Sequence, residues 1–490
     1  MFLAAMDSAV TATAAPQIVA DLGDGTAFSW LLTAYVLAAT VSGPLYGRLA
    51  DTHGRRPVLV GGTLLFLSGS ALCAAGWNMP SLVAFRSVQG LGAGAIQVTV
   101  QTVAGDLYQP HERGRIQAAL ASVWSVAALA GPAVGGALAQ YGHWRGIFLL
   151  NLPLGLAAVW LLVRRFPVED VRSGTSGPVD WRGALGLLLT CATLMTLLVQ
   201  AGTAWPWVSV QSGALLTVLL ALILTTARIE RRAVQPFMPG WVWQRRELAV
   251  PSLVLGLLGV IMTAPLLLLP VYAQAVLGLG PAAGAAVLAG MTFGWPTAAV
   301  FSSGLYLRVG FRDAALTGAA TVTVALVATV SLTVAGAHAL LFVAASTLLG
   351  IGLGLLQPAL LVGVQAAVTW DGRGAATANL MFCRETGQSL GAALFGALFN
   401  AAGNPGIAVA TDCAAVCEER VAAGLRYTYF AGVGFAAAMV LLLLMTPRTS
   451  VRSGGCTSSP RRPTPRPRRP APGVRADSTG RPQAEPGSSR

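Results

Sequence analysis

Long apolar runs alternate with short connections rich in Gly, Pro and charged residues along most of the chain. Each run has about the 20 residues that an α-helix needs to cross the hydrocarbon core of a bilayer. The pattern therefore predicts an all-α polytopic membrane protein with about 14 transmembrane helices. The expected spans are residues 1–20, 28–47, 57–76, 81–104, 117–140, 146–164, 183–201, 213–229, 248–272, 281–306, 314–336, 338–362, 376–401 and 424–446.

Composition supports the same class of protein. Hydrophobic residues make up 54% of the 490 residues, charged residues only 10%, and the mean hydropathy is +0.66. A soluble chain carries about 25% charged residues, so this one cannot cover a surface that faces water. Residues 447–490 differ, because they are rich in Pro, Arg, Ser and Gly and contain almost nothing apolar. We expect this tail to be disordered.

Arginine sets the expected orientation. Every one of the 32 basic residues is Arg, against 19 acidic residues, and the net charge is +13. If alternate connections face the cytoplasm, 27 of the 32 Arg fall on that side, and only Arg145, Arg420 and Arg426 fall on the other. The positive-inside rule then places both termini in the cytoplasm. The basic tail lacks aromatic residues, so we expect contact with water or anionic lipid and no nucleic-acid partner.

A weak internal repeat divides the chain. The segment 47–56, with Gly47, Gly54 and two Arg, follows the second span, and the similar segment 304–312 follows the tenth. Internal repeats of this kind characterise secondary transporters. We expect an N-terminal six-helix bundle at 1–164, two linker helices with cytoplasmic loops at 165–247, a C-terminal six-helix bundle at 248–446 and a disordered basic Pro/Arg-rich cytoplasmic tail at 447–490.

Four ionisable side chains stand well inside the expected spans: Asp7, Arg86, Arg384 and Glu385. Each is costly in a bilayer unless it faces protein or water. At 100° per residue each shares a narrow arc with polar neighbours. Those neighbours are Ser8 and Thr11 in the first span, Gln89, Gln97 and Gln101 in the fourth, and Thr377, Gln388 and Ser389 in the thirteenth. Three such stripes predict one shared water-accessible cavity, with hydrogen bonding between helices as the alternative.

A carboxylate in a cavity that opens alternately to two sides is a natural proton carrier. Desolvation raises the pKa of a carboxyl group, and a nearby Arg lowers it. An Arg that moves towards the carboxyl group, or a cation that binds beside it, therefore displaces the proton from it. Asp7 lies close to Met1, with no preceding Arg to anchor the helix, and we expect the natural start of the chain to lie upstream.

The fifth span carries a dense Gly/Pro motif. Gly131, Gly135 and Gly136 leave room for a close neighbouring backbone, and Pro132 frees a carbonyl one turn earlier and bends the helix. A generic packing motif is the alternative interpretation. The six Cys are scattered without metal-ligand spacing, so no metal site is expected.

Five motifs together resemble the major facilitator superfamily, and specifically its fourteen-helix drug:proton antiporter branch, over residues 1–446. The first motif runs from Leu3 to Pro16 and contains Asp7, and the second is the loop with Gly47, Asp51, Gly54, Arg55 and Arg56. The third runs from Phe85 to Ala93 and contains Arg86 and Gln89. The fourth runs from Ala130 to Leu138 with Gly131, Pro132, Gly135 and Gly136, and the fifth runs from Trp144 to Gly155. The departures are Thr52 in place of a basic residue, Gly146 in place of an aromatic one, and Glu385 where the branch more often has Gln.

The resemblance assigns a role to each motif. It implies a cytoplasmic gating loop at Gly47, Asp51, Gly54, Arg55 and Arg56, and an exporter motif at Gly131, Pro132, Gly135 and Gly136. Asp7 is then the proton carrier, Arg86 its modulator and Glu385 an auxiliary carboxylate. The candidates for contact with substrate in the cavity are Thr11, Gln89, Gln97, Gln101, Arg384 and Gln388.

The expected function is proton-coupled export of small amphipathic compounds such as drugs or antibiotics by alternating access. The expected partners are substrate, protons and the lipid bilayer of the plasma membrane, and no cofactor is needed because the proton gradient drives transport. We expect a functional monomer. Uptake by symport or facilitated diffusion is the alternative within the same fold. A membrane-embedded enzyme is the alternative from another class, but no catalytic constellation stands out, because the four His lie in separate connections.

Overall fold

The computed structural model describes residues 1–23, 28–140, 144–166, 181–201, 205–232, 240–280, 284, 286–401 and 415–446. The proposed tail at 447–490 lies outside these residues. The helices are α1 (Phe2–Leu22), α2 (Phe28–His53), α3 (Arg55–Ala74), α4 (Met79–Leu107), α5 (Pro110–Gln140), α6 (Arg145–Arg165), α7 (Trp181–Gln200), α8 (Val210–Arg232), α9 (Gly240–Gln244), α10 (Arg246–Ala275), α12 (Ala289–Val309), α13 (Phe311–Val334), α14 (Ala339–Ala367), α15 (Trp370–Ala401) and α16 (Ala415–Leu444).

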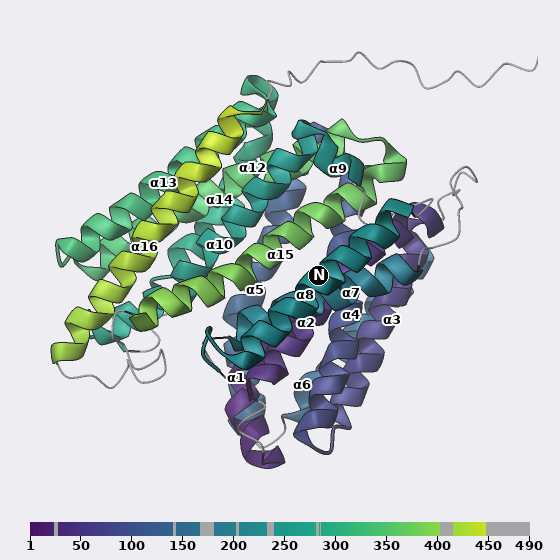
Figure 1. Ribbon diagram of the computed structural model, residues 1–490, viewed down its shortest axis with the longest axis horizontal. Helices are drawn as coiled ribbons and strands as arrows, with labels where there is room; N and C mark the ends of the chain where they lie inside the picture. Colours follow the sequence, from purple (N-terminus) through teal and green to yellow (C-terminus); the bar gives the residue numbers. More distant parts are fainter. Residues whose placement is uncertain are drawn as a thin grey trace, which may run out of the picture. The chain divides into compact units, whose positions relative to one another are not determined.

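Each expected span overlaps one of the long helices, which Figure 1 labels. Within the described residues, eight helices are long and apolar enough to cross a membrane, namely α3, α5, α6, α8, α10, α13, α14 and α16. The chain is therefore an all-helical membrane protein, and the count of fourteen spans stays a prediction. The tenth span was expected to begin at residue 281, but α12 begins at Ala289. Val287 donates its N–H to the carbonyl of Gly284 at 3.3 Å, a turn that an apolar run does not reveal.

Helix pairing repeats between the two ends of the chain. In the first set α1 packs on α5, α2 and α3 both pack on α4, and α3 packs on α6. In the second set α10 packs on α15, α12 and α13 both pack on α14, and α13 packs on α16. The two sets meet where α2 lies along α15 and where α5 lies along α12. These two contacts are equivalent under the repeat.

The repeat extends to the backbone after the second helix of each set. Gly54 has φ 91° and ψ 157° between α2 and α3, and Gly310 has φ 92° and ψ 161° between α12 and α13. Side chains other than Gly rarely adopt this positive φ, so both positions require glycine. The similarity noticed between residues 47–56 and 304–312 therefore corresponds to one local structure formed twice.

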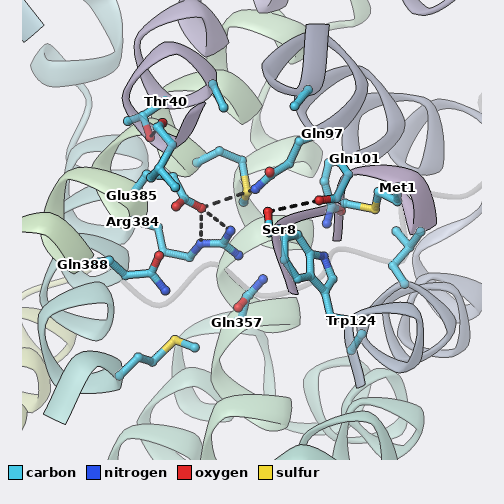
Figure 2. A pocket seen from close by; sticks show the side chains of 18 of the residues that line it. Met1, Ser8, Thr40, Gln97, Gln101, Trp124, Gln357, Arg384, Glu385 and Gln388 are labelled. Carbon is cyan, nitrogen blue, oxygen red and sulfur yellow. Dashed lines mark hydrogen bonds and ion pairs between the residues drawn. The ribbon is translucent and has the colours of Figure 1, made fainter. Parts of the chain in front are cut away.

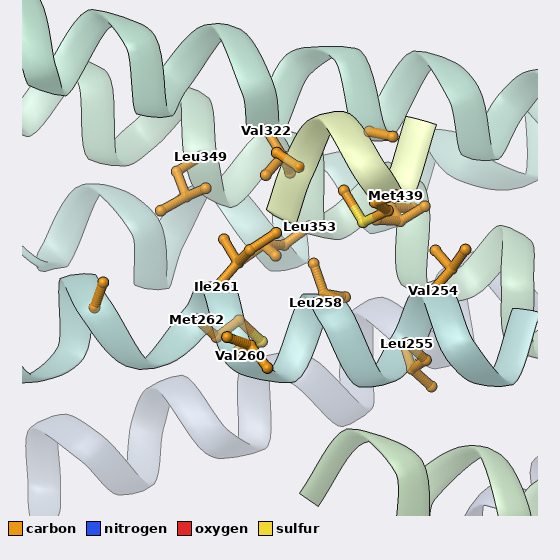
Figure 3. Close-up of a cluster of buried hydrophobic side chains, with 14 of the residues drawn as sticks. Val254, Leu255, Leu258, Val260, Ile261, Met262, Val322, Leu349, Leu353 and Met439 are labelled. Carbon is orange, nitrogen blue, oxygen red and sulfur yellow. The ribbon is translucent and has the colours of Figure 1, made fainter. Parts of the chain in front are cut away.

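The largest apolar cluster fills the second set of helices (Figure 3). Leu258 and Ile261 of α10 lie against Val322 of α13, Leu353 of α14 and Met439 of α16, and all are buried. Gly318 and Gly352 let α13 and α14 approach closely, because an added β-carbon at Gly318 would lie 2.6 Å from the backbone nitrogen of Leu356. Apolar packing and close glycine contacts thus hold this set together.

Helices α7 and α8 form a hairpin beside the two sets. The Oγ1 atoms of Thr190 and Thr226 lie 3.2 Å apart between α7 and α8. Helix α7 also packs on α2 and α15, where Leu187 and Cys191 join a small apolar cluster with Val41. The hairpin therefore lies along one of the two places where the sets meet.

Candidate functional site

The carboxylate of Asp7 is buried inside the first set of helices. Its Oδ2 lies 2.5 Å from Nη1 of Arg86 on α4. Its Oδ1 accepts hydrogen bonds from Nε2 of Gln89 at 2.9 Å and from Nδ2 of Asn151 on α6 at 2.8 Å. Asp7 is 1% exposed, and Arg86 and Gln89 are 0% exposed. The charge of Asp7 is therefore balanced by one cation and two amide donors.

Ser70 on α3 completes this buried cluster. Its Oγ accepts from Gln89 Nε2 at 3.2 Å and from Asn151 Nδ2 at 3.0 Å, and donates to the carbonyl of Phe148 at 2.9 Å. Four helices thus contribute to one hydrogen-bonded network around Asp7. We call Asp7, Ser70, Arg86, Gln89 and Asn151 the carboxylate cluster.

Arg86 is also held by an aromatic ring and by its Nε. Its guanidinium carbon lies 4.2 Å from the centroid of the Tyr35 ring, and its Nε donates to the carbonyl of Leu31 at 3.4 Å. Its Nη2 is buried without a hydrogen-bond partner. Tyr35 Oη donates to the carbonyl of Ala4 at 3.2 Å. Tyr35 therefore connects α2 to α1 on one side and stacks on Arg86 on the other.

A separate cavity of about 430 Å³ opens between the two sets of helices (Figure 2). This volume is in the range of pockets that hold drug-sized molecules. Its polar lining includes Gln97, Gln101, Gln117, Gln357, Arg384, Glu385 and Gln388. Trp124, Trp295 and Phe382 contribute apolar and aromatic surface. The lining therefore combines broad apolar contact with several amide groups and one charged pair.

Glu385 connects the two sets across this cavity. Its Oε1 accepts from Nε of Arg384 at 3.2 Å and also from Nη2 of Arg384. The same atom accepts from Nε2 of Gln97 on α4 at 3.3 Å. The Arg384 and Glu385 side chains are 12% and 18% exposed. This charged pair is therefore in contact with the cavity, unlike Asp7 and Arg86.

The expectation of a single shared cavity is wrong for part of the predicted set. Gln97, Gln101, Arg384, Glu385 and Gln388 line the cavity as expected. Asp7, Arg86, Gln89 and Thr11 do not line it, and all four are buried. Ser8 and Tyr35 lie in the cavity wall next to the carboxylate cluster. A helical wheel gives the direction of a side chain but not which neighbouring helix covers it, so these residues could not be separated from the cavity lining.

The predicted gating loop joins the two sets of helices at one end of the bundle. Asp51 at the end of α2 accepts from the backbone N–H groups of Gly374 at 2.9 Å and Ala375 at 2.8 Å, both in the first turns of α15. Gly47 is equally close, because an added β-carbon there would lie 2.7 Å from the carbonyl oxygen of Gly374. The carboxylate thus receives donors from a helix N-terminus across the interface.

Arg55 extends this contact. Its Nη1 lies 2.5 Å from Asp51 Oδ1, its Nε donates to Asp106 Oδ2 at 2.9 Å, and its Nη2 donates to the carbonyl of Trp370 at 3.1 Å. Oδ1 of Asp106 on α4 also accepts a hydrogen bond from Nη1 of Arg373 on α15 at 2.6 Å. We call Asp51, Arg55, Asp106, Arg373 and Gly374 the interface latch. Arg56, the next residue of the motif, instead donates to the carbonyl of Val163 on α6.

Burial raises the pKa of Asp51 to about 6, although Arg55 and the two backbone N–H groups of α15 act in the opposite direction. Asp51 lies beyond the expected end of the second span. Asp51 therefore titrates near the end of α2, outside the expected bilayer interior.

An equivalent contact joins α12 to α5. Tyr306 Oη donates to the carbonyl of Pro110 in the first turn of α5. Gly114 packs close by, since an added β-carbon there would lie 2.8 Å from Cβ of Ser303. Where Arg55 follows Gly54 in the first copy of the repeat, Phe311 follows Gly310 in the second and stacks on Tyr306 with ring centroids 5.1 Å apart. The contact between α2 and α15 therefore depends on ion pairs, whereas the equivalent contact between α12 and α5 depends on Tyr306, on which Phe311 stacks.

The glycines of the fifth-span motif bring α5 close to α1. An added β-carbon at Gly131 would lie 3.2 Å from the carbonyl carbon of Ala9, and one at Gly135 would lie 2.8 Å from the carbonyl oxygen of Val10. Gly136 has nothing within 4 Å of its added β-carbon. The side chain of Pro132 lies outside the described residues. Two of the three glycines thus position the helix that carries Asp7.

Several residues of these sites were not singled out from the sequence as site residues. They are Ser70, Asn151, Asp106, Gln117, Gln357 and Arg373. Asn151 had a usable signal, because it stands inside the Trp144 to Gly155 motif. Ser70 and Gln357 had none, since single polar residues in apolar helices more often bond to a neighbouring helix.

The sequence also matches known proteins. The family profile described as Major Facilitator Superfamily covers residues 1–392. The chain is 29% identical over 405 residues to the Multidrug transporter protein MdtP of Bacillus subtilis, which is 82% of this chain and 74% of that protein. It is 30% identical over 415 residues to the Efflux pump FUS6 of Gibberella moniliformis, which is 81% of this chain and 72% of that protein.

Solved structures share the arrangement of helices. The human organic anion transporter MFSD10 (TETRAN) superposes with a TM-score of 0.59 at 14% identity, covering 90% of this chain and 97% of that one. The proton:xylose symporter XylE superposes with a TM-score of 0.62 at 13% identity, covering 91% of this chain and 94% of that one. At these identities the likeness concerns the fold alone.

Proposed function

Because the chain belongs to the Major Facilitator Superfamily and is a membrane transporter of that family rather than an enzyme, we propose that it exports small amphipathic compounds in exchange for protons. The observation that carries this proposal is the cavity between the two sets of helices, with residues from both sets in its wall. Relatives named as a multidrug transporter and an efflux pump favour export over uptake.

Proton coupling is assigned to the carboxylate cluster. Asp7 is charge-balanced by Arg86 and is separated from the cavity by the wall that contains Ser8 and Tyr35. A proton on Asp7 removes the counterion of Arg86, and a buried guanidinium without a counterion is costly. The cluster then rearranges, and Tyr35, which touches both Arg86 and the cavity, passes this change to the substrate site. Glu385 acts as an auxiliary carboxylate on the other side of the cavity.

Alternating access follows from the interface latch. The contacts of Asp51, Arg55 and Arg373 join the ends of α2 and α4 to the start of α15, so they close one end of the path between the two sets. Breaking them lets the sets rock and opens the cavity to that end. We place this end in the cytoplasm because of the distribution of Arg along the chain. The remaining parts of the proposal are fourteen spans, two six-helix bundles with a two-helix insertion, both termini in the cytoplasm, the plasma membrane as location, and a functional monomer.

Directional transport tests the function. Membrane vesicles of both orientations would be given a panel of neutral and cationic amphipathic fluorescent dyes and an imposed pH gradient. The proposal expects accumulation in inverted vesicles that stops when a protonophore collapses the gradient. Accumulation only in right-side-out vesicles would support uptake, the alternative within this family. Dye entry that only equilibrates and is unchanged by the protonophore would support facilitated diffusion.

A further inference from the structure

The cavity wall contains one buried acceptor without a partner. Gln357 of α14 is 5% exposed and lines the cavity, and its Oε1 makes no hydrogen bond within the described part of the chain. In the view of Figure 2, Gln357 lies among the cavity side chains near Arg384 and Trp124. Buried carbonyl oxygens are nearly always hydrogen-bonded, because leaving one unpaired costs free energy. The position therefore suits a donor group that a bound molecule supplies.

Further amide groups in the same wall have unused capacity. Gln117 Nε2 donates to Gln101 Oε1 at 2.9 Å, which leaves the Gln101 amide nitrogen as a donor. The side-chain amide of Gln388 makes no hydrogen bond to another described residue. A side-chain amide has two N–H donors and one carbonyl acceptor, of which Gln101 keeps the donors and Gln388 keeps both kinds. The wall is thus suited to a molecule with several hydroxyl or amide groups.

The charged side chains in the wall cancel each other. Arg384 and Glu385 are the only charged side chains among the described residues that line the cavity, and they pair with each other. A cation beside Glu385 would also lie beside Arg384, whose Nε and Nη2 donate to Oε1 of Glu385, so the guanidinium would repel it. An anion beside Arg384 would be repelled in the same way by the carboxylate of Glu385. A net charge on the ligand is therefore penalised at this site.

We propose that the cavity selects compounds without net charge that carry several hydroxyl or amide N–H donors on an apolar frame, and that Gln357 is a residue that determines this preference. This inference rests on the proposed export function and names the substrate class of the same cavity. Trp124, Trp295 and Phe382 hold the apolar frame, while Gln357 accepts from one of its donors.

Three soluble probes with one aromatic group in common test the inference: 4-nitrophenyl β-D-glucopyranoside, 4-nitrophenyltrimethylammonium and 4-nitrophenyl phosphate. Binding to the purified full chain in lipid nanodiscs would be measured calorimetrically without a pH gradient. We expect the neutral glucoside to bind at least about tenfold more tightly than either charged probe. Gln357→Leu should weaken glucoside binding about fivefold, the size of one lost neutral hydrogen bond, and leave the charged probes unchanged.

Gln109→Leu is the matched control, because Gln109 is exposed between α4 and α5 and lies outside the cavity. Gln357→Met provides a second apolar variant if Gln357→Leu does not fold. The inference is overturned if the ammonium or phosphate probe binds as tightly as the glucoside, if the glucoside does not bind, or if both Gln357 variants bind it as the wild type does. Since no gradient is present, these results are independent of the dye experiment, whose failure would instead reject proton-coupled export.

Discussion

Two opposite charges are buried together in the carboxylate cluster, and their mutual dependence is open to test. Asp7→Asn keeps the size of the side chain but leaves Arg86, which is 0% exposed, without a counterion. We expect this variant to lose about 3–5 kcal/mol of stability. The double variant Asp7→Asn with Arg86→Met should recover most of that loss, because no uncompensated charge remains.

Thermal unfolding of the wild type, both single variants and the double variant in the same detergent would measure this coupling. If Asp7→Asn unfolds at the wild-type temperature, the short contact between Asp7 and Arg86 contributes nothing to the folded state and the description of the cluster is wrong.

Asp51 gives a pH dependence with a defined sign. Burial raises its pKa from 3.8 to about 6, so the folded protein holds this proton more tightly than the unfolded chain does. The resulting stabilisation is fully present below the unfolded pKa and is lost as the pH rises to the folded value. We therefore expect the melting temperature of the wild type, measured relative to Asp51→Asn, to fall between about pH 4 and pH 6 and to stay level above.

The comparison with Asp51→Asn removes the contributions of other titrating groups, which both proteins share. A relative melting temperature that rises over the same interval would mean that the attraction of Arg55 outweighs the burial of Asp51.

The sequence could identify single candidate residues but could not predict which side chains surround them. Asp7, Arg86 and Glu385 stand out because charge is rare in apolar spans, and the structure places the first two within 2.5 Å of each other. The sequence could not show that Asn151 and Ser70 cover Asp7, because their partners are on helices far away in the chain. Gln357 was invisible for a similar reason, since only the packed structure reveals an acceptor without a donor.

Among the helices, the contact between α1 and α5 offers an internally controlled prediction. Gly135→Ala would place a β-carbon 2.8 Å from the carbonyl oxygen of Val10, and a backbone atom cannot move aside. The helices must separate, and we expect a loss of about 1–3 kcal/mol. Gly136→Ala meets nothing within 4 Å and should be neutral or slightly stabilising, because Ala favours a helix.

Unfolding of the two variants side by side, together with transport, measures this difference. Equal destabilisation by both substitutions would show that the glycines act through backbone flexibility and not through the close approach of α1.

Helix limits were predictable only to within several residues, even where apolar runs end at charge or at glycine. The second span was expected to end at residue 47, but α2 continues to His53, and Gly54 with its positive φ separates it from α3. The tenth and eleventh spans were expected to end at residue 306 and begin at residue 314, whereas only Gly310 separates α12 from α13. The start of α12 and the short helix α9 were not predictable. An apolar run continues through the turn before Ala289, and the five residues of α9 are too few for a periodic pattern.

Taken as a whole, the molecule has two related sets of helices joined by two equivalent contacts, and its orientation is a prediction of its own. In a chain with all native Cys replaced, Trp77→Cys lies in the exposed connection between α3 and α4 and should react with an impermeant thiol reagent added outside. Gln109→Cys lies between α4 and α5 and should react only after permeabilisation. The motivation is the excess of Arg in alternate connections.

Labelling in intact cells and in permeabilised cells gives the answer directly. Reaction of Gln109→Cys in intact cells, with none at Trp77→Cys, would invert the proposed topology and would place the interface latch on the outer side.

The central claim is that substrate movement is exchanged for protons at Asp7, and proton flux in proteoliposomes tests it most directly. The wild type, Asp7→Asn and Glu385→Gln would be reconstituted in equal amounts with a lumenal pH dye, given an imposed pH gradient, and challenged with a compound that the wild type transports. We expect substrate-dependent proton flux in the wild type, none in Asp7→Asn, and a modest reduction in Glu385→Gln, because Glu385 is auxiliary. Normal coupling in Asp7→Asn together with its loss in Glu385→Gln would contradict the account and place the proton site in the cavity wall of α15.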